Sequence, residues 1–401
     1  MLVLVINAGS SSLKYQLMKA ENGDVLAKGL AERIGVGNAL IKHSRTGEAT
    51  TSIAVDMPNH KVAVAAVLQI LTSPDHGIIK SMDEIDAVGH RVVHGGEKFS
   101  ASAMITPEVK RAIRACYELA PLHNPPNMTG IEACEEAMPG VPQVAVFDTA
   151  FHQSMPAHSF MYALPYELYE KYGIRKYGFH GTSHSYVSRR AAEMLNKPYE
   201  NMKIITCHLG NGSSIAAVKN GRCFDTSMGL TPLAGICMGT RCGDIDPAIV
   251  SFLMEKEKLE PKAIDDLMNK KSGVAGVSGV SSDFRDLYSA AGEGNKRAAL
   301  ALDMFKYQLR RFIGAYAAAM GGVDAVVFTA GIGENTPDIR YGACHGLGYM
   351  GIQLDPYKNV AVKSREAIVS TDDSPVKVMV IPTNEELAIA QETARVSGFK
   401  V

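Results

Sequence analysis

Three short turns rich in glycine, serine and asparagine have the composition of loops that bind phosphate groups. They lie at residues 7–12 (NAGSSS), 208–214 (HLGNGSS) and 331–335 (GIGEN). Small residues let several backbone amides converge on one anion, and serine hydroxyls add further donors. A single polar glycine turn is more often a plain connector between strands. Three such turns in one chain favour a phosphate-containing ligand.

None of these turns matches the Walker A pattern, in which a lysine and a serine or threonine follow the second glycine. The first two turns lead into alternating apolar segments, at residues 13–17 and 215–218, that are typical of strands. Phosphate-binding loops of the Walker or Rossmann kind lead into a helix instead. The sequence therefore argues against both of those loop types.

Four charged or titratable side chains could act on such a ligand: Arg91, Asp148, His180 and Arg241. Phosphoryl transfer depends on positive charge around the moving group and on in-line positioning. A planar guanidinium can contact a phosphoryl or carboxylate group at two points. Each residue also has a plain alternative role. The arginines could be solvated surface charges, Asp148 a turn cap, and His180 a hydrogen-bonded core residue.

The elements that must position these residues follow from the apolar pattern. Residues 2–6 form a strand that leads through the first turn to a strand over 13–17. Residues 204–208 lead in the same way through the second turn to a strand over 215–218, before an Asn-Gly hairpin signal at residues 220–221. Two similar hairpins half a chain apart predict a duplicated α/β architecture.

Alternating helices and strands fill the rest of the chain. Helical spacing occurs at residues 107–116, 131–137, 296–320 and 385–396, and buried strands are predicted at 143–147 and 325–329. Asp148 directly follows one of these strands, at the end that commonly meets ligand in α/β sheets. We expect two domains, residues 1–150 and 151–384, with the segment 385–401 packed back on the first.

Composition argues against several classes of protein. The 401 residues include 41 Lys and Arg against 42 Asp and Glu, so the formal net charge is -1. That balance offers no attraction to nucleic acid or to a membrane surface. The apolar opening at residues 1–6 is too short for a signal peptide or a membrane span. Seven cysteines without a C-x-x-C pair argue against a disulfide framework or a zinc site, and we expect a cytoplasmic protein.

Nine motifs, in order along the chain, resemble those of the acetate kinase (acetokinase) family, within the superfamily of actin, Hsp70 and sugar kinases. They are VINAGSSSLK at residues 5–14, HRVVHGG at 90–96, LHNPPN at 122–127, FDTAFH at 147–152, YGFHGTSH at 177–184, HLGNG at 208–212, GTRCGD at 239–244, GIGEN at 331–335 and TNEE at 383–386. The resemblance covers nearly the whole chain. It implies two duplicated actin-like (ribonuclease H-like) α/β domains with a cleft between them, and a homodimer.

The activity implied by this resemblance is reversible transfer of the γ-phosphoryl group of ATP to acetate, which gives acetyl phosphate and ADP by direct in-line transfer. The implied metal is Mg²⁺, with Mn²⁺ as the alternative. Two rival functions stay open: a propionate or other short-chain fatty acid kinase, and an actin- or Hsp70-like ATPase switch. The switch would need a peptide-binding or polymer-forming segment, whereas the kinase motifs take up this chain.

By the same resemblance, Arg91 and Arg241 hold the acceptor carboxylate and the transferring phosphoryl group. His180 donates to the phosphoryl oxygens, with His123 and His208 as secondary contacts. Asp148 is assigned to orientation and charge balance, because an ionised carboxylate acceptor has no proton for a base to remove. The implied acceptor pocket consists of Arg91, Val93, Leu122, Phe179 and Pro232, and the alternative for its apolar members is plain core packing.

For the nucleotide, the resemblance implies phosphate contacts from Lys14, His208, Leu209, Gly210, Asn211 and Gly212. It implies ribose and adenine contacts from Asp283, Phe284 and Arg285, and from Gly331, Ile332, Gly333, Glu334 and Asn335. Ser281 and Ser282 are predicted to cap a helix at the first of these segments. The implied magnesium ligands are Asn7 and Glu385, whose plain alternatives are a turn residue and a first-turn helix acid.

Overall fold

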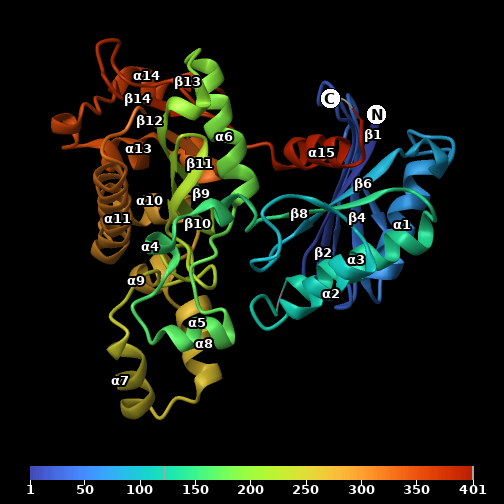
Figure 1. Cartoon of the computed structure of the whole chain (residues 1–401), viewed down its shortest axis with the longest axis horizontal. Helices are drawn as coiled ribbons and strands as arrows, with labels where there is room; N and C mark the ends of the chain where they lie inside the picture. The colour runs from blue at the N-terminus through green and yellow to red at the C-terminus, as the bar shows by residue number, and fades with distance from the viewer. Residues whose placement is uncertain (122, 400–401) are drawn as a thin grey trace. The chain divides into compact units, whose positions relative to one another are not determined.

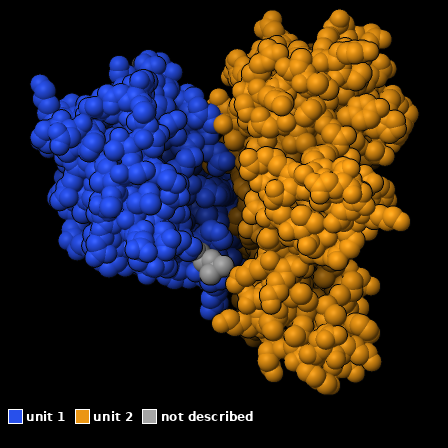
Figure 2. Space-filling view, turned by 180° about the vertical axis from the view of Figure 1, so that it is seen from behind, with its two compact units in different colours: residues 1–153, 384–401 blue, residues 154–383 orange. Residues whose placement is uncertain are grey.

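The structure is a computed structural model that describes residues 1–121 and 123–399. The chain divides into two compact units, coloured separately in Figure 2. Unit 1 consists of Met1–Gln153 and the segment from Asn384 onward, and unit 2 of Ser154–Thr383. The chain therefore passes from one unit to the other twice. No helix among the described residues combines the length and apolar character that a membrane span needs.

Within the described residues, unit 1 has an eight-stranded sheet in the order β5-β4-β3-β2-β1-β6-β8-β7. Its strands are β1 (Leu2–Ala8), β2 (Ser12–Lys19), β3 (Val25–Glu32), β4 (Leu40–Arg45), β5 (Thr51–Ala54), β6 (Ala87–Val92), β7 (Ala103–Met104) and β8 (Gln143–Phe147). β1 pairs antiparallel with β2, from Leu2 opposite Lys19 to Ala8 opposite Leu13. β1, β6 and β8 are parallel, so their carboxyl ends lie at one edge.

Helices cover both faces of this sheet: α1 (His60–Thr72), α2 (Pro107–Ala115), α3 (Asn124–Ala137) and α15 (Glu385–Val396). Alternate residues of β1 belong to different apolar clusters. Leu4 and Ile6 share a cluster with residues of α1 and α3, whereas Val3 and Val5 share one with Ile389 of α15. The continuous apolar run of β1 thus reflects burial on both of its faces.

Unit 2 has a six-stranded sheet among the described residues, in the order β11-β10-β9-β12-β14-β13. Its strands are β9 (Lys203–Leu209), β10 (Ser213–Lys219), β11 (Arg222–Thr226), β12 (Ala325–Thr329), β13 (Ala367–Ile368) and β14 (Lys377–Val380). β9 pairs antiparallel with β10 and parallel with β12, which is parallel to β14. The carboxyl ends of β9, β12 and β14 therefore meet at one edge, as in unit 1.

The helices of unit 2 are α4 (Ala157–Phe160), α5 (Tyr166–Tyr172), α6 (Gly181–Met194), α7 (Ala248–Lys256), α8 (Pro261–Lys270), α9 (Gly273–Ser278), α10 (Phe284–Gly292), α11 (Lys296–Met320), α12 (Ala330–Asn335), α13 (Pro337–Cys344) and α14 (Pro356–Val360). The long α11 and α6 lie on opposite sides of the sheet (Figure 1). Ile205 and Cys207 of β9 pack in the α11 cluster. Thr206 of β9 bonds to α6 instead.

The two sheets repeat one plan. Among the described residues, antiparallel strands precede three parallel ones in each sheet, four of them in unit 1 and two in unit 2, and a short antiparallel strand closes the far edge. α6 follows β8 along the chain but packs on β9 and β12, whereas α15 follows β14 and packs on β1, β6 and β8. The predicted duplication of α/β elements is confirmed. In each unit, one covering helix comes from the part of the chain that follows the sheet of the other unit: α15 in unit 1 and α6 in unit 2.

Two local expectations differ from the structure. The helix predicted over residues 131–137 begins at Asn124, because prolines 125 and 126 occupy its first turn, where a backbone N–H has no helical partner to lose. Residues 331–335, predicted as a turn, lie in helix α12. Glycine-rich composition weakens a helix locally, and here hydrogen bonds from Arg340 of α13 to the Gly333 and Glu334 carbonyls stabilise it.

Candidate active site

The first group of candidate residues lies at the carboxyl edge of the parallel strands in unit 1. Arg91 stands near the end of β6, Asp148 directly after β8, and Asn7 near the end of β1. Arg91 donates from Nε to Asp148 Oδ1 at 3.1 Å and from Nη2 to Oδ2 at 2.5 Å. Its Nη1 donates to Asn7 Oδ1 at 3.4 Å. The two parallel bonds fix the plane of the guanidinium.

Burial and charge act together on this group. Asp148 is 1% exposed and the Arg91 side chain is 22% exposed. Burial raises the pKa of Asp148, an effect that Arg91 opposes. Burial by itself would lower the pKa of Arg91, but the carboxylates of Asp148 and Glu385 outweigh it and the pKa is raised. Arg91 therefore keeps its charge, and most of that charge is neutralised within the chain.

Helix α15 adds two more carboxylates to the same corner. Asn384 caps it by accepting a bond from the Leu387 N–H at 3.1 Å, which leaves Glu385 as the first helical residue. Burial raises the pKa of Glu385, with opposing contributions from Arg91 and Lys14. Lys14 forms an ion pair with Glu386. The two cations, Arg91 and Lys14, thus lie among three carboxylates, those of Asp148, Glu385 and Glu386. This excess of negative charge favours binding of a further cation.

Asn127 was not singled out from the sequence, yet it organises this edge. Its side chain, buried in α3, accepts a bond from the Val93 N–H at 3.1 Å and donates to the Ala8 carbonyl at 2.7 Å. It therefore ties the end of β1 to the segment after β6. Val93 is 5% exposed. Leu122, predicted beside it, lies outside the described residues.

In unit 2, a network of histidines and hydroxyls surrounds the start of α6. His180 precedes the helix with φ of 58°, a left-handed conformation that is strained for a residue other than glycine. Its Nδ1 is 2.9 Å from Ser214 Oγ, which is also 2.7 Å from His184 Nε2. His184 Nδ1 in turn meets Thr206 Oγ1 at 2.7 Å. His180 is thus held by buried groups whose contact with it sequence analysis did not predict, although Ser214 lies in the second turn and His184 stands one helical turn after His180.

The predicted phosphate turn of β9 and β10 lies beside His180. The His180 and His208 rings stack with centroids 4.1 Å apart, and Ser183 Oγ is 2.8 Å from His208 Nδ1. A Cβ added to Gly212 would come within 3.3 Å of Arg241 Nη1 and 3.8 Å of His180 Cε1. Glycine at this position therefore leaves room for the turn, the histidine and the arginine to converge.

Arg241 differs from Arg91 in having no anionic partner among the described residues. Its Nη1 donates to the Pro232 carbonyl at 3.2 Å and lies 3.7 Å from Met238 Sδ. Among the described residues, no carboxylate forms an ion pair with it. Burial accordingly lowers its pKa. A half-buried guanidinium without a counter-ion is a site prepared for an anion.

The loop that carries Arg241 is rigidly fixed to the phosphate turn. It is closed by Asp244, whose N–H donates to the Gly235 carbonyl at 2.7 Å while its Oδ1 accepts from the Gly235 N–H at 2.7 Å. Gly239 N–H donates to the Asn211 carbonyl at 3.0 Å. A Cβ on Gly239 would lie 1.8 Å from Asn211 Oδ1, so a larger residue here would displace the Asn211 side chain from its present position.

The segments predicted for ribose and adenine are partly surface and partly core. Asp283 itself caps α10, accepting from the Arg285 N–H at 2.8 Å, so the predicted Ser281-Ser282 cap is wrong by one residue. The Arg285 side chain also bonds to Asp283 and lowers the pKa of that carboxyl to about 2. The Phe284 ring packs edge-on against Phe305 in the core, with centroids 4.9 Å apart.

Helix α12 carries the other predicted nucleotide segment. It begins at Ala330, whose φ of 63° is left-handed. Nothing lies within 4 Å of a Cβ added to Gly331, so the helix surface is open there. Asn335 Nδ2 donates to the Gly331 carbonyl at 3.0 Å, and Glu334 Oε1 accepts from the Thr383 N–H at 3.3 Å.

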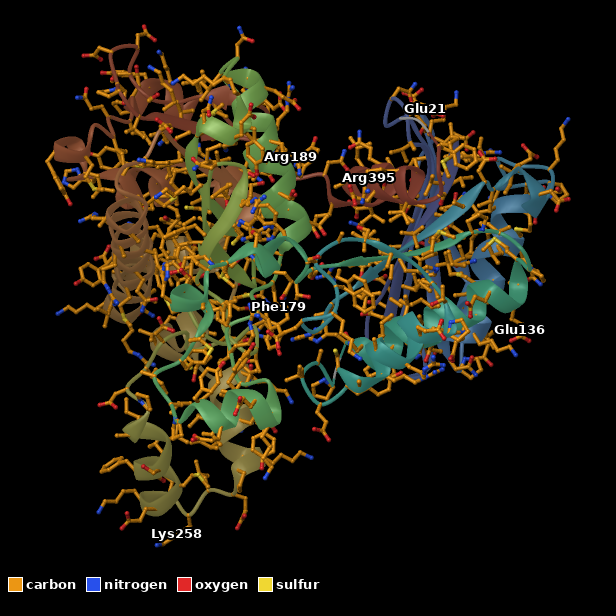
Figure 3. All side chains as sticks on the ribbon, viewed as in Figure 1. Glu21, Glu136, Phe179, Arg189, Lys258 and Arg395 are labelled. Atoms are coloured by element: carbon orange, nitrogen blue, oxygen red, sulfur yellow. The ribbon has the colours of Figure 1, made fainter. Side chains whose placement is uncertain are left out.

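The remaining predicted residues are buried or half-buried within their units. Leu209 is fully buried, and Ile332 packs against the same core cluster. Phe179, labelled in Figure 3, is 2% exposed and directly precedes His180. Pro232 contributes its carbonyl to Arg241. No group of three or more His, Cys, Asp or Glu side chains suited to a metal occurs in the part of the chain that the structure describes.

Comparison with known proteins adds to this geometry. The acetokinase family matches residues 2–391. The chain is 63% identical to the acetate kinase of Alkaliphilus metalliredigens over 393 residues, 98% of this chain and 99% of that protein. It is 62% identical to the acetate kinase of Methanosarcina acetivorans over 401 residues, 100% of this chain and 98% of that protein.

Solved structures agree with the sequence comparison. The crystal structure of Porphyromonas gingivalis acetate kinase superposes with a TM-score of 0.96 at 51% identity, covering 98% of this chain and 99% of that one. A propionate kinase from Francisella tularensis superposes with a TM-score of 0.90 at 42% identity, covering 98% of each chain. The predicted fold class, the α/β fold of the actin-like sugar kinases, is confirmed.

The contrast between the two arginines predicts that their removal affects stability to very different extents. Arg91→Ala leaves Asp148 buried and unpaired and should cost about 3–5 kcal/mol of unfolding free energy. Arg241→Ala removes an uncompensated charge and should change stability by no more than about 0.5 kcal/mol. Urea unfolding at pH 7 measures both, followed by circular dichroism because the chain has no tryptophan.

The double variant Arg91→Met/Asp148→Leu is the control for this comparison. It removes both charges, so most of the loss caused by Arg91→Ala should be recovered. Equal destabilisation by Arg91→Ala and Arg241→Ala would contradict the assignment of paired and unpaired arginines.

Proposed function

The chain belongs to the acetokinase family, and on that premise we propose that it transfers the γ-phosphoryl group of ATP to acetate. A carboxylate oxygen of acetate attacks the γ-phosphorus and forms the new O–P bond. The bond between the γ-phosphorus and the bridging oxygen breaks, and ADP leaves. Acetate is already ionised, so no proton has to be removed. The observation that carries this proposal is the uncompensated Arg241 guanidinium beside His180 and the Gly212 turn.

Arg241 and His180 stabilise the charge of the moving phosphoryl group. The Arg241 guanidinium lacks a carboxylate partner, so it can engage an anion without first breaking an ion pair. His180 is held by Ser214 on its Nδ1 side, and its Nε2 edge faces the Gly212 turn. Fixed donors of this kind need little reorganisation as the reaction proceeds. Lys14 and the turn His208–Gly212 are the proposed contacts to the remaining phosphates.

Arg91 binds the acceptor carboxylate in this scheme, and Asp148 holds Arg91 in place. The bidentate bond between them leaves Arg91 Nη1, which reaches Asn7, as the side of the fork open to other partners. Asp148 is therefore a positioning group and a charge balance for Arg91. It has no task as a base, because the acceptor carries no proton to remove. Val93, Leu122, Phe179 and Pro232 are the proposed apolar lining of the acceptor pocket.

A divalent cation is part of the proposed reaction. The donor set around Arg91 fits Mg²⁺, since Asn7, Asp148 and Glu385 can bind a cation only through oxygen atoms and carboxylates outnumber cations there. We propose Asn7 and Glu385 as its protein ligands, with Mn²⁺ as an alternative ion. When bound, the ion neutralises phosphate charge. Asp283–Arg285 and Gly331–Asn335 are the proposed ribose and adenine contacts.

Two further properties are proposed from family membership. We propose that the chain forms a homodimer, and sedimentation equilibrium that shows only monomer at micromolar concentration would contradict this. We also propose that it acts in the cytoplasm, where ATP is available. Neither nucleic acid nor a membrane is required for the reaction.

The alternatives differ in what they produce. An ATPase switch releases inorganic phosphate, whereas a kinase of this class makes an acyl phosphate that hydroxylamine traps as a hydroxamate. We expect ATP, Mg²⁺ and acetate to give hydroxamate with the purified chain. Phosphate release without hydroxamate would support the switch.

Arg241→Ala should lower kcat in this assay about 10²–10³-fold, as expected for loss of one preorganised donor to the transition-state charge. Arg241→Lys keeps the charge but not the planar fork, so it should recover only part of the loss. The folded state of each variant is checked by circular dichroism. Near-normal turnover of Arg241→Ala would remove Arg241 from the catalytic assignment.

Val93→Ala tests the choice between acetate and propionate. Removing two methyl groups should open space for a longer acceptor and raise kcat/KM for propionate relative to acetate by up to about tenfold. If Val93 only packs the core, the variant should instead lose stability and slow all acceptors alike. Ratios of kcat/KM for acetate, propionate and butyrate decide between these results.

A further inference from the structure

Arg340 on α13 is fully buried and uses every one of its N–H donors. Nε donates to Asn359 Oδ1 at 2.7 Å. Nη1 donates to the carbonyls of Gly333 and Glu334, both at 2.9 Å. Nη2 donates to the carbonyls of Asn359 at 2.7 Å and Val362 at 3.0 Å. All five bonds end on neutral oxygens.

A fully buried guanidinium that binds only neutral oxygens is unusual. Arginine is rarely buried without an anionic partner, and burial lowers the pKa of Arg340 to about 10. The neighbouring Arg310 of α11 is a simpler case. It makes one such bond, from Nη2 to the Gly342 carbonyl at 2.6 Å. Arg340 is therefore specifically adapted to hold several carbonyl groups in one arrangement.

Two of those carbonyls belong to the last turn of α12. The last four carbonyls of a helix have no partner within it, and a cation there satisfies them. α12 is only six residues long and contains two glycines, so it has little stability of its own. It also begins at the strained Ala330. Arg340 therefore fixes α12 at its carboxyl end.

The other acceptors anchor Arg340 to the neighbouring α14. Asn359 accepts at both its side chain and its carbonyl, and its own Nδ2 donates to the Pro337 carbonyl at 2.8 Å. Beyond α14, Ser364 Oγ donates to Asn335 Oδ1 at 3.0 Å. α12 is thus clamped at its carboxyl end while its Gly331 surface stays open.

We propose that Arg340 is a positioning residue for the nucleotide: by binding the carboxyl end of α12, it holds Gly331–Asn335 in the conformation that receives ADP or ATP. This inference rests on the proposed function, which assigns that segment to the ribose and adenine. Arg340 touches no reacting atom in this scheme. Its loss acts on nucleotide affinity and leaves the transfer step intact.

The test compares Arg340→Lys and Arg340→Ala with the wild-type chain in the hydroxamate assay. KM for ATP should rise about tenfold in both variants, since several bonds to a charged group are lost. We expect kcat and KM for acetate to stay within about twofold of the wild type. Guanidinium ion at a concentration that does not denature the protein should restore KM for ATP in Arg340→Ala, whose cavity fits it. It should leave Arg340→Lys unchanged.

Arg310→Met is the matched control, because it removes a guanidinium bound to α13 that makes no bond to α12. Its KM for ATP should not change. An unchanged KM for ATP in folded Arg340→Lys and Arg340→Ala overturns the proposal, as does a rise with equal losses in kcat and acetate affinity. If Arg340→Ala does not fold, KM for ATP is compared between Arg340→Lys, Arg310→Met and the wild-type chain.

Calorimetric binding of ADP separates this proposal from the proposed function. A wild-type chain that neither binds ADP nor forms hydroxamate contradicts the nucleotide site itself. A wild-type chain that binds ADP, with Arg340 variants that bind it equally well, overturns only the role of Arg340. Weaker binding by the Arg340 variants but not by Arg310→Met supports the role.

Discussion

Parallel pairing of three strands in each unit is the constraint on which both candidate groups depend. β1, β6 and β8 run in the same direction, so the chain delivers Asn7, Arg91 and Asp148 to one edge from three distant parts of the sequence. β9 and β12 do the same for the phosphate turn and for α12. The three central strands of each mixed sheet can be parallel because helices bury both faces of the sheet there. The polar groups gather where the buried strands end, and the apolar residues between them fix the register.

The carboxyl edges of the parallel strands carry different charges in the two units. In unit 1, Arg91 is compensated by Asp148, and the carboxylates of α15 leave an excess of negative charge. In unit 2, Arg241 is uncompensated, and the residues that hold it are neutral. The edge in unit 1, where Arg91 is already paired, therefore favours binding of a cation. The edge in unit 2, which carries Arg241, favours binding of an anion. Phosphoryl transfer with a divalent ion needs both kinds of environment.

Sequence patterns predicted the strands, the duplicated hairpins and the position of Asp148 after a buried strand, because these depend on local periodicity and turn composition. They did not predict the roles of Asn127, Ser214 or Thr206, whose side-chain partners lie 22 or more residues away and leave no local signal. The helical state of residues 331–335 was missed for a different reason: the glycine-rich composition indicates a turn, and nothing in the pattern shows that the Arg340 side chain binds the Gly333 and Glu334 carbonyls. Likewise, Phe284 beside Asp283 gave no sign that its ring faces the core.

The position of α15 in the chain has a consequence for how the protein is made. Val3 and Val5 lose contact with water only when Ile389 and its neighbours in α15 arrive, yet all of unit 2 is synthesised in between. At about 5–20 residues per second, that interval is on the order of 10 to 50 s. The unit that begins first is therefore completed last. Its half-covered sheet emerges from the ribosome as a surface that chaperones would recognise, until the final helix closes it.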